Sequence, residues 1–375
     1  MTSTTTSKDP LEPGPEQWSV DRRTGRTAFQ QRRRRNWIIT GTAAVVAVVV
    51  VIAFVATRTG SGDRLSFTVA YGQGNVASSD SIIATQPSLA KTIPATLKFV
   101  PFNAGVTAIA ELRSGSLQAI SGVGNPPVVG AIGNGTDVVV VLAQSFDADA
   151  LIVPASITDA SQLAGKSVGV LVGSSEDFEL RGWLALQHLT DSVKVVGLAS
   201  EQAVAAAYLA GTLAGAYVQA GPEAQLTAKG GHALTDAQKI AKLGIPGLNV
   251  VAVSKKSIDQ NPEVVQKYVC AEVQATRDFT GPQADKFLAQ SAGAQGVAAN
   301  LIVSATKNFP FIPLDEQLQW LGKTKNDTSS PIVKAYAQTA QFLLGQGRIK
   351  TIPSNDVLAA HVDSSFVKKA LDGGC

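Results

Sequence analysis

The sequence predicts an α/β protein of two lobes, preceded by one transmembrane helix. Three observations carry this prediction. Residues 37–56 form an apolar stretch without a charged side chain. Downstream of it, strand-like and helix-like patterns alternate in two successive runs, as they do in βαβ units. The composition is rich in Gly, Ala and Val, with only 6% aromatic residues, which suits closely packed α/β layers.

The apolar stretch is long enough to cross a membrane, because about 20 helical residues span about 30 Å, the thickness of the hydrocarbon core. Arginines crowd the upstream side, whereas only Arg58 and Arg64 follow closely. The positive-inside rule therefore predicts a single-pass protein of the cell membrane, with residues 1–36 as a disordered cytosolic tail, 37–56 as the anchor and 57–63 as an extracytoplasmic linker. A cleaved export signal and a buried soluble helix remain as alternatives.

The charge balance separates the tail from the remainder. Residues 1–56 carry eight Lys and Arg and four Asp and Glu, a net charge of +4. Of the 32 basic and 29 acidic residues in the whole chain, 24 and 25 remain, a net charge of −1. The basic tail suits anionic lipid. The near-neutral outer segment gives no support for nucleic-acid binding.

The first run of alternating patterns begins at Leu65. We expect strands that form a mostly parallel sheet, with helices between them. The expected strands are 65–71, 96–102, 118–123 and 137–143, and the expected helices are 79–90, 106–113 and 127–132.

The second run begins after Pro154 and is followed by one more strand and a helical remainder broken by prolines. Chain crossings near 148–151 and 247–250 would join the two lobes, with a hinge and a ligand cleft between them. The expected strands are 167–172, 194–198, 214–218 and 249–254, and the expected helices are 176–189, 201–209 and 222–229.

Cysteine and histidine are scarce. Cys270 and Cys375 either pair or remain as one core thiol and one terminal thiol, and we favour the unpaired interpretation. His188, His232 and His361 lie far apart and show no metal-ligand spacing. We therefore expect no metal site and no cofactor.

Three strand-to-helix turns offer backbone N–H groups at helix N-termini, where anions bind readily. The turns are 71–75, 122–127 and 173–175. The first is a glycine-containing loop that lacks a dinucleotide or P-loop fingerprint, and the second ends in two prolines. In the last turn we expect Ser174 to cap the following helix, with Asp177 three residues on.

The chain resembles the taurine and aliphatic-sulfonate substrate-binding proteins of ABC importers. The resemblance covers about residues 64–367 and follows the order of the family's motifs. The segments that carry it are 69–71, 102–105, 110–115, 122–126, 163–170, 211–218, 261–265 and 339–343.

The resemblance implies a type II periplasmic-binding fold that closes on its ligand by hinge motion, with lobe 1 formed by 64–147 and 249–375 and lobe 2 by 148–248. It implies delivery of a small anionic ligand to a membrane permease driven by a cytosolic ATPase. We expect a monomer without catalytic residues. The ligand-binding residues that the resemblance implies are Tyr71, Gln73, Asn75, Gly124, Asn125, Ser174, Ser175, Tyr217, Gln219 and Asn249.

Departures from the family's pattern bear on the ligand. Relatives that bind taurine have carboxylates near positions that here read Ala214 and Asn249, and Gln219 stands where they have Trp. An unpaired buried ammonium costs several kcal/mol. We therefore expect a small organosulfonate, either taurine-like or an alkanesulfonate, or a related anion, and the departures favour a ligand without an amine. Glu176 or Asp177 would be substitutes, but we expect both to face solvent and to favour the helix dipole.

Two other functions compete with import. A membrane-anchored sensor would use the same outer domain, but the short tail would need a signalling partner. An enzyme related to thiamine-pyrimidine synthases shares this fold, but it would need a reactive histidine and a cysteine-containing iron motif, which the sequence lacks.

Overall fold

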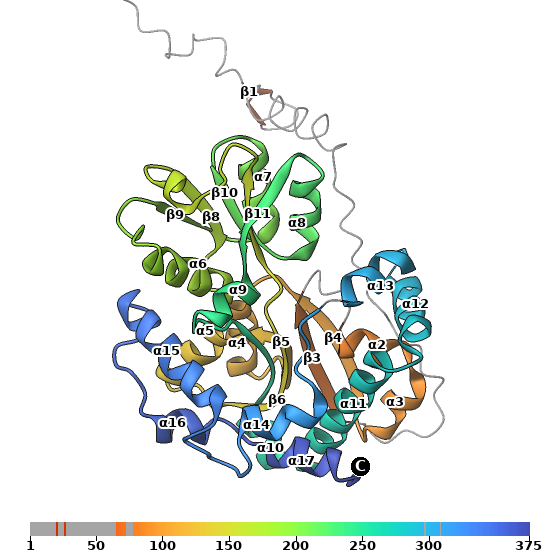
Figure 1. The fold of residues 1–375 in the computed structure, drawn as a ribbon. Coiled ribbons are helices and arrows are strands. Elements are labelled where there is room, and N and C mark those ends of the chain that lie inside the picture. Colours follow the sequence, from red (N-terminus) through yellow and green to blue (C-terminus); the bar gives the residue numbers. More distant parts are fainter. Residues whose placement is uncertain (1–19, 22–25, 28–64, 73–77, 296–297, 308) are drawn as a thin grey trace, which may run out of the picture. The chain divides into compact units, whose positions relative to one another are not determined.

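The computed structural model describes residues 20–21, 26–27, 65–72, 78–295, 298–307 and 309–375 (Figure 1). The expected anchor, residues 37–56, lies outside them. Among the helices that are described, none has both the length and the apolar character needed to cross a membrane.

The chain forms two units, Met1–Ala56 and Thr57–Cys375, which we describe separately. In the first unit, β1 (Val20–Asp21) pairs antiparallel with β2 (Arg26–Thr27). These four residues depart from the expected tail without secondary structure, although so short a pair adds little stability of its own.

The second unit contains two five-stranded sheets. The first sheet, with the helices packed on it, is called lobe 1, and its strand order is β4-β3-β5-β12-β6. Its strands are β3 (Ser66–Gly72), β4 (Thr96–Phe102), β5 (Ala119–Gly124), β6 (Val138–Phe146) and β12 (Leu248–Ser254).

The second sheet, with its own helices, is called lobe 2, and its strand order is β11-β7-β10-β8-β9. Its strands are β7 (Ala150–Pro154), β8 (Ser167–Leu171), β9 (Lys194–Leu198), β10 (Gly215–Val218) and β11 (Gly231–Asp236). In Figure 1 the green elements of lobe 2 lie together, apart from the orange, yellow and blue elements of lobe 1.

The expectation of a mostly parallel sheet is confirmed, although one strand in each five-stranded sheet runs opposite to the other four. In lobe 1, β4, β3 and β5 are parallel, but β12 runs antiparallel to both β5 and β6. In lobe 2, β7 runs antiparallel to β10 and β11. The physical reason is the crossing: a strand that enters a lobe from the other lobe inserts between strands that already point the opposite way. The sequence analysis also missed β7 and β11.

Helices cover both sheets. In lobe 2 they are α6 (Ser175–Leu186), α7 (Glu201–Leu209), α8 (Ala220–Thr227) and α9 (Ala237–Lys242). In lobe 1 they are α2 (Ser79–Thr85), α3 (Pro87–Thr92), α4 (Gly105–Ser114), α5 (Asn125–Gly133), α10 (Lys255–Gln260), α11 (Pro262–Thr280), α12 (Ala284–Gln295), α13 (Ala299–Lys307), α14 (Gln317–Leu321), α15 (Pro331–Gly345), α16 (Asn355–Ala360) and α17 (Ser365–Leu371). Short 3₁₀ turns lie at Ala160–Leu163 and Leu314–Glu316.

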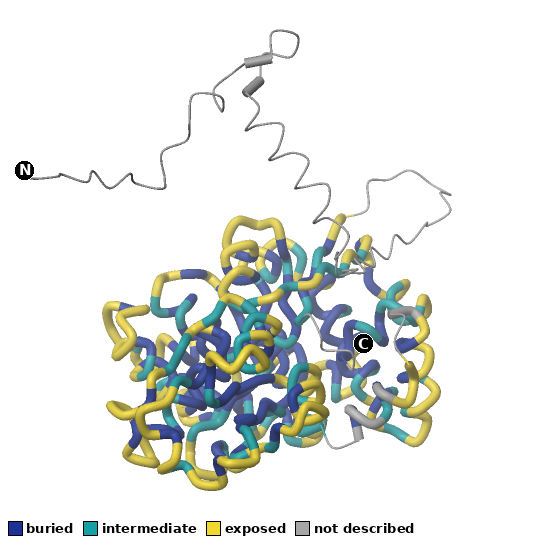
Figure 2. Tube along the Cα trace, turned by 90° about the horizontal axis from the view of Figure 1, so that it is seen from above, coloured by how far each residue is buried: buried dark blue, intermediate teal, exposed yellow. Residues whose placement is uncertain are grey.

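The period-two alternation of strand side chains builds a core on each face of the lobe 2 sheet. Along β7, Leu151 and Val153 enter the core that contains Trp183 of α6, whereas Ala150 and Ile152 enter the core on the opposite face. The sheet is therefore a buried middle layer, and the exposed residues in Figure 2 lie mainly on the outer helices and loops.

The two cysteines form a disulfide, Cys270–Cys375, with a Cα–Cα distance of 5.8 Å. The interpretation as two unpaired thiols is therefore wrong. Helix α17 packs on α11 and brings the chain's last residue beside Cys270, and Lys267 of α11 also donates to the Cys375 carbonyl oxygen. A separation of 105 residues in sequence hides this proximity.

Candidate functional site at the lobe junction

Two chain segments pass between the lobes side by side. The first joins β6 to β7 through Asp147, and the second leads through Gly247 into β12. The Asp147 N–H donates to the Gly247 carbonyl oxygen at 3.1 Å. The crossings expected near 148–151 and 247–250 thus meet, and the groups around them form the candidate site.

The turn after β5 contacts the turn before α6 across the junction. A Cβ built on Gly124 would lie 2.9 Å from Oγ of Ser175, so only glycine permits this approach. Beside it, Gly173 has a φ of +75° and lies against the guanidinium group of Arg348. Two of the turns expected to bind anions are therefore brought together from different lobes.

Ser174 caps α6 as expected. Its Oγ accepts from the Asp177 N–H at 3.3 Å and donates to the Leu171 carbonyl oxygen at 2.7 Å. Asp177 accepts from the Gly173 N–H and pairs with Arg181 at 2.6 Å. The expectation that Asp177 faces solvent is wrong, because it is 2% exposed and completes the turn.

Asn125 is fully buried, and its amide holds the junction together. Its Nδ2 donates to Oγ1 of Thr339 at 2.7 Å and to the Pro246 carbonyl oxygen at 3.3 Å, and its Oδ1 accepts from the Leu248 N–H at 3.1 Å. The amide is thus engaged in joining α5 to the second crossing.

On the lobe 2 side, Tyr217 is buried and its hydroxyl donates to Oε2 of Glu179 at 2.7 Å. Gln219 is exposed. Its Nε2 donates to Oε1 of Glu176 at 2.9 Å, and its backbone N–H donates to Oε2 of Glu201 at 3.0 Å.

On the lobe 1 side, Asn249 donates to Oδ1 of Asp147 at 2.6 Å and lines a cavity of about 20 Å³ whose walls are partly polar and partly apolar. This volume holds about one water molecule. Tyr71 is half-buried, and burial together with the nearby Asp80 raises the pKa of its hydroxyl. Gln73 and Asn75 lie outside the described residues.

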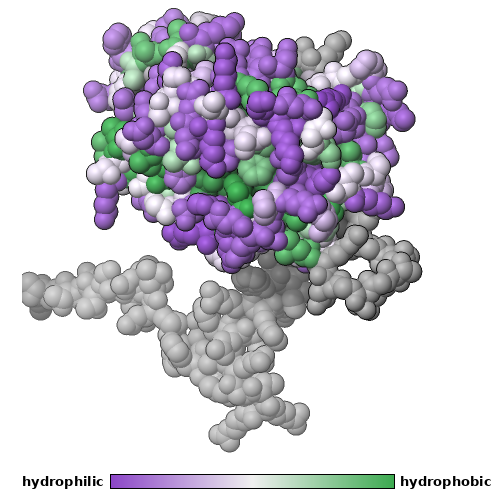
Figure 3. Space-filling view, turned by 90° about the horizontal axis from the view of Figure 1, so that it is seen from below, coloured by the Kyte–Doolittle hydropathy of each residue, from purple (hydrophilic) through white to green (hydrophobic). Residues whose placement is uncertain are grey.

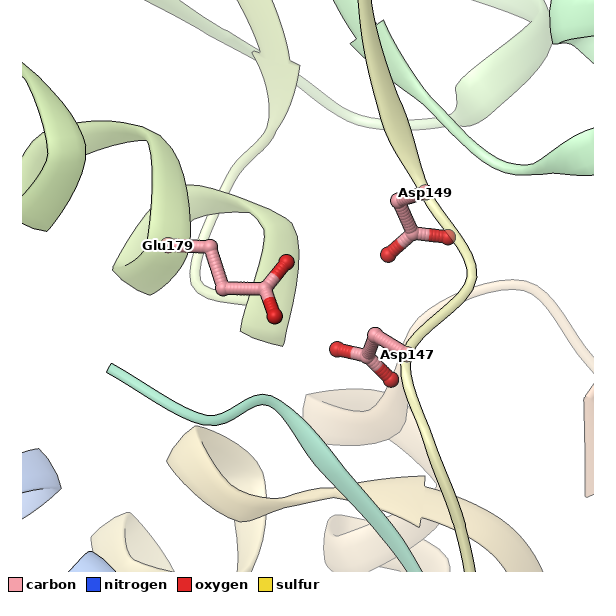
Figure 4. Close-up of side chains that lie close together, drawn as sticks. All are labelled: Asp147, Asp149 and Glu179. Atoms are coloured by element: carbon pink, nitrogen blue, oxygen red, sulfur yellow. The ribbon is translucent and has the colours of Figure 1, made fainter. Parts of the chain in front are cut away.

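A cluster of carboxyl groups, not predicted from the sequence, surrounds these residues. Each is nine-tenths buried or more, and Figure 4 shows three of them pointing toward one another. The members are Asp147 and Asp149 of the first crossing, Glu176 and Glu179 of α6, and Glu201 of α7.

Burial raises the pKa of four of these carboxyls, and repulsion by their neighbours adds to it. The pKa of Asp147 rises to about 7, through burial and then Glu176, although Ser175 and Asn249 lower it. The pKa of Glu201 rises to about 8, through burial and then Glu176. Burial, followed by neighbouring carboxylates, also raises the pKa values of Asp149 and Glu179. In all four cases burial is the largest cause, and the charged groups that raise the pKa further are other carboxyls.

One sequence signal pointed to the cluster. Glu176 and Glu179 lie three residues apart and therefore share one face of α6. We expected Glu176 to face solvent, which is wrong, because it is 2% exposed and bonded to Gln219. The position of Asp147 and Asp149, on either side of Ala148 in the crossing, carries no periodic pattern that would reveal their burial.

Comparisons with known proteins match this architecture. Residues 66–293 match the NMT1-like family. The taurine-binding periplasmic protein of Escherichia coli K12 is 28% identical over 328 residues, which are 84% of this chain and 96% of that protein.

Two solved structures share the fold. The alkanesulfonate-binding protein SsuA of Xanthomonas axonopodis pv. citri, bound to MOPS, has a TM-score of 0.64 at 20% identity and covers 80% of this chain and 99% of its own. The aliphatic sulphonate binding protein SsuA of E. coli has a TM-score of 0.63 at 19% identity and covers 80% and 92%. The α/β fold of periplasmic binding proteins is thereby confirmed.

Proposed function

The chain belongs to the NMT1-like family, and we propose that it is the extracytoplasmic substrate-binding component of an ABC importer for a small organosulfonate. The observation that carries this proposal is the junction of two sheets at paired crossings, where turns from both lobes meet. The relatives reported above are named as taurine-binding and sulfonate-binding proteins, which supports a binding role over an enzymatic one.

The lobes bind ligand by opening and closing about the crossings. We assign residues 64–147 and 249–375 to lobe 1 and residues 148–248 to lobe 2. The contact between Gly124 and Ser175 represents the closed junction, so the lobes must separate before a ligand enters. The closed form then presents the ligand to a permease with its ATPase.

The charges at the junction favour a sulfonate that carries an amine. The sequence argument for an amine-free ligand assumed that carboxylates are absent, but Glu176 and Glu201 both bond to Gln219, which is exposed. Oε1 of Glu201 is buried and has no hydrogen-bond partner. An ammonium group there would reduce the repulsion between the two carboxylates, whereas a plain anion would increase it. We therefore propose a taurine-like zwitterion as the ligand.

Calorimetric titration of the full-length protein in mild detergent tests this proposal. We expect taurine to bind with a Kd of about 1–10 μM, corresponding to about 7–8 kcal/mol, and ethanesulfonate, which lacks the amine, to bind at least about tenfold more weakly. Glu201→Gln removes one charge near the ammonium and should weaken taurine binding while affecting ethanesulfonate less. Equal or tighter binding of ethanesulfonate by the wild-type protein would refute the zwitterion, and binding of neither would refute the sulfonate class.

Importer and sensor share this outer domain, so a second experiment separates them. We expect uptake of taurine in cells to require this chain together with a permease and its ATPase. Growth on taurine as the sulfur source should stop when the chain is deleted. Unchanged uptake after deletion, with altered expression of other genes instead, would favour the sensor.

We propose that residues 37–56 anchor the protein in the membrane with the tail in the cytosol. The support is the sequence: an uncharged stretch of this length after a run of arginines. Tethering keeps the binding domain near its permease and raises its effective concentration. Mass spectrometry of the mature protein tests this, because a new N-terminus near Thr57 would show cleavage instead.

We also propose that the protein is a monomer. On the face shown in Figure 3, hydrophobic residues form small groups interrupted by hydrophilic ones. Large apolar patches usually mark an interface. Light scattering after size exclusion should give the mass of one chain once the detergent contribution is subtracted, and a mass of two chains would contradict this.

A further inference from the structure

Three carboxylates converge at the first crossing. Asp147 and Asp149 flank Ala148, and Glu179 reaches them from α6 (Figure 4). One oxygen from each of the three lies within 4.8 Å of the others. Their exposed fractions are 4%, 6% and 0%, so water screens their mutual repulsion little.

The hydrogen bonds leave part of this cluster without a partner. Oδ1 of Asp147 accepts from Asn249, but Oδ2 is buried and receives no hydrogen bond. For Asp149, burial acts most strongly on the carboxyl, and the charged groups that follow are other carboxyls. Buried polar groups in native proteins are nearly always paired, so Oδ2 of Asp147 requires an explanation.

Glycine at position 247 lets the oxygens approach one another. A Cβ on Gly247 would lie 2.2 Å from Oδ2 of Asp147 and 2.3 Å from Oε1 of Glu179. The unpaired oxygen of Asp147 and Oε1 of Glu179 therefore both lie against Gly247, whose N–H donates to Oε1 of Glu179 at 3.0 Å. Asp149 points toward this region from the crossing strand in Figure 4.

The chemistry of the donors indicates what would occupy the site. All three side chains offer oxygen, which hard cations prefer, and none offers the nitrogen or sulfur typical of zinc sites. Oxygens on opposite sides of Ca²⁺ are separated by about 4.6–5.2 Å, because each lies about 2.3–2.6 Å from the ion. The three oxygens of the cluster lie within 4.8 Å of one another, so one ion can contact all three.

We propose that Asp147, Asp149 and Glu179 bind a hard divalent cation such as Ca²⁺ at the lobe junction. Three carboxylates at one ion give a strongly attractive site, and the remaining ligands would be water. Because Asp147 and Asp149 lie on the crossing and Glu179 lies on α6, the ion joins the crossing strand to the first helix of lobe 2. This proposal does not rest on the identity of the sulfonate ligand.

Terbium luminescence tests the proposal directly. Tb³⁺ occupies Ca²⁺ sites, and a nearby phenol sensitises its emission. The Tyr217 hydroxyl is 2.7 Å from Oε2 of Glu179, so bound Tb³⁺ should emit on excitation of tyrosine. The full-length protein, treated with chelator and without sulfonate, should show emission that Ca²⁺ displaces, and calorimetry with CaCl₂ should give one site.

Variants assign the signal to the cluster. Asp149→Asn keeps the shape of the side chain and should weaken Ca²⁺ binding at least tenfold. Asp80→Asn is the matched control, because Asp80 is an equally buried carboxyl in lobe 1 with an unpaired oxygen, and its loss should leave Ca²⁺ affinity unchanged. A far-UV circular dichroism spectrum like that of the wild type shows that each variant is folded.

Two outcomes would overturn the proposal. The first is a wild-type protein that shows neither Ca²⁺ heat nor displaceable Tb³⁺ emission. The second is a Ca²⁺ affinity that Asp149→Asn leaves unchanged, which would place the ion elsewhere. If Ca²⁺ does not bind and Asp149→Asn abolishes taurine binding, the cluster serves the ligand's ammonium group and the cation proposal is wrong. If the wild-type protein binds Ca²⁺ but not taurine, the result counts against the proposed function alone.

Discussion

Substituting Glu201 by Gln should make the protein less sensitive to alkaline pH. Glu201 is buried, its Oε1 has no hydrogen-bond partner, and Glu176 is the main charge acting on it. Gln at this position keeps an acceptor for the Gln219 N–H and adds an N–H₂ group that can donate to Glu176. The substitution therefore removes the ionisable carboxyl while preserving the packing around it.

The sign and size of the effect follow from the pKa shift. Glu201 has an ordinary pKa of 4.5, which rises to about 8 in the folded protein. The folded state thus holds the proton more tightly. The contribution of Glu201 to the free energy of unfolding is complete below pH 4.5 and is lost as the pH rises through about 8. Each pH unit inside this window changes the free energy of unfolding by about 1.4 kcal/mol, so the whole window amounts to about 5 kcal/mol.

Urea unfolding of the full-length protein in mild detergent, at pH 5, 6.5 and 8, measures this effect. Tryptophan fluorescence follows the unfolding, and Trp183 contributes the lobe 2 part of the signal because its side chain lies in the core between α6 and the sheet. The unfolding free energy of the variant minus that of the wild type should grow by about 3 kcal/mol or more between pH 5 and 8. Glu263→Gln, at an exposed position of α11, is the matched control. A constant difference across this pH range would refute the electrostatic reasoning.

Three further substitutions test the junction and the C-terminus. Cys375→Ser removes the disulfide to Cys270, which closes a loop of about 100 residues, and should lower the free energy of unfolding in urea by about 3–5 kcal/mol. A reducing agent should lower the stability of the wild type by the same amount and leave that of the variant unchanged. Equal stability of the wild type and the variant under oxidising conditions would contradict this. Gly247→Ala forces a Cβ against carboxylate oxygens and should lower the melting temperature, with a cost of about 1–3 kcal/mol, so an unchanged melting temperature would count against the crowding. Tyr217→Phe removes the donor to Glu179 and should cost about 1 kcal/mol in urea, whereas a more stable variant would show that this hydrogen bond contributes nothing.

Local patterns predicted the elements that local chemistry determines. Ser174 caps α6 because a serine before an acidic first turn satisfies the free N–H groups there, and this is readable from a few residues. The same holds for the prolines that open α5. The order of the family's motifs then supplied the two-sheet architecture, which alternation of strands and helices could only suggest.

Long-range packing determined what the sequence did not reveal. Strand β12 runs antiparallel because it returns from lobe 2 into a sheet already formed, and no local pattern records that direction. The disulfide depends on α17 packing on α11. In both cases the controlling contact joins segments about 100 residues apart.

The candidate site shows the same division between local and long-range effects. Two of the three turns expected to bind anions lie where the lobes meet, but Asn125 and Ser174 use their polar atoms to hold these turns in place. The charges come instead from Asp147, on a crossing without a periodic pattern, and from Glu176, at a helix start where an acidic residue is ordinarily explained by the dipole. Burial makes these carboxylates attract a positive charge. At a surface, such a carboxylate would only interact with the helix dipole, but beneath the second lobe it loses its water and needs a cation as partner. Closure of the lobes and binding of a positive charge should therefore support each other, so cation or zwitterion binding should favour the closed form more than a plain sulfonate does.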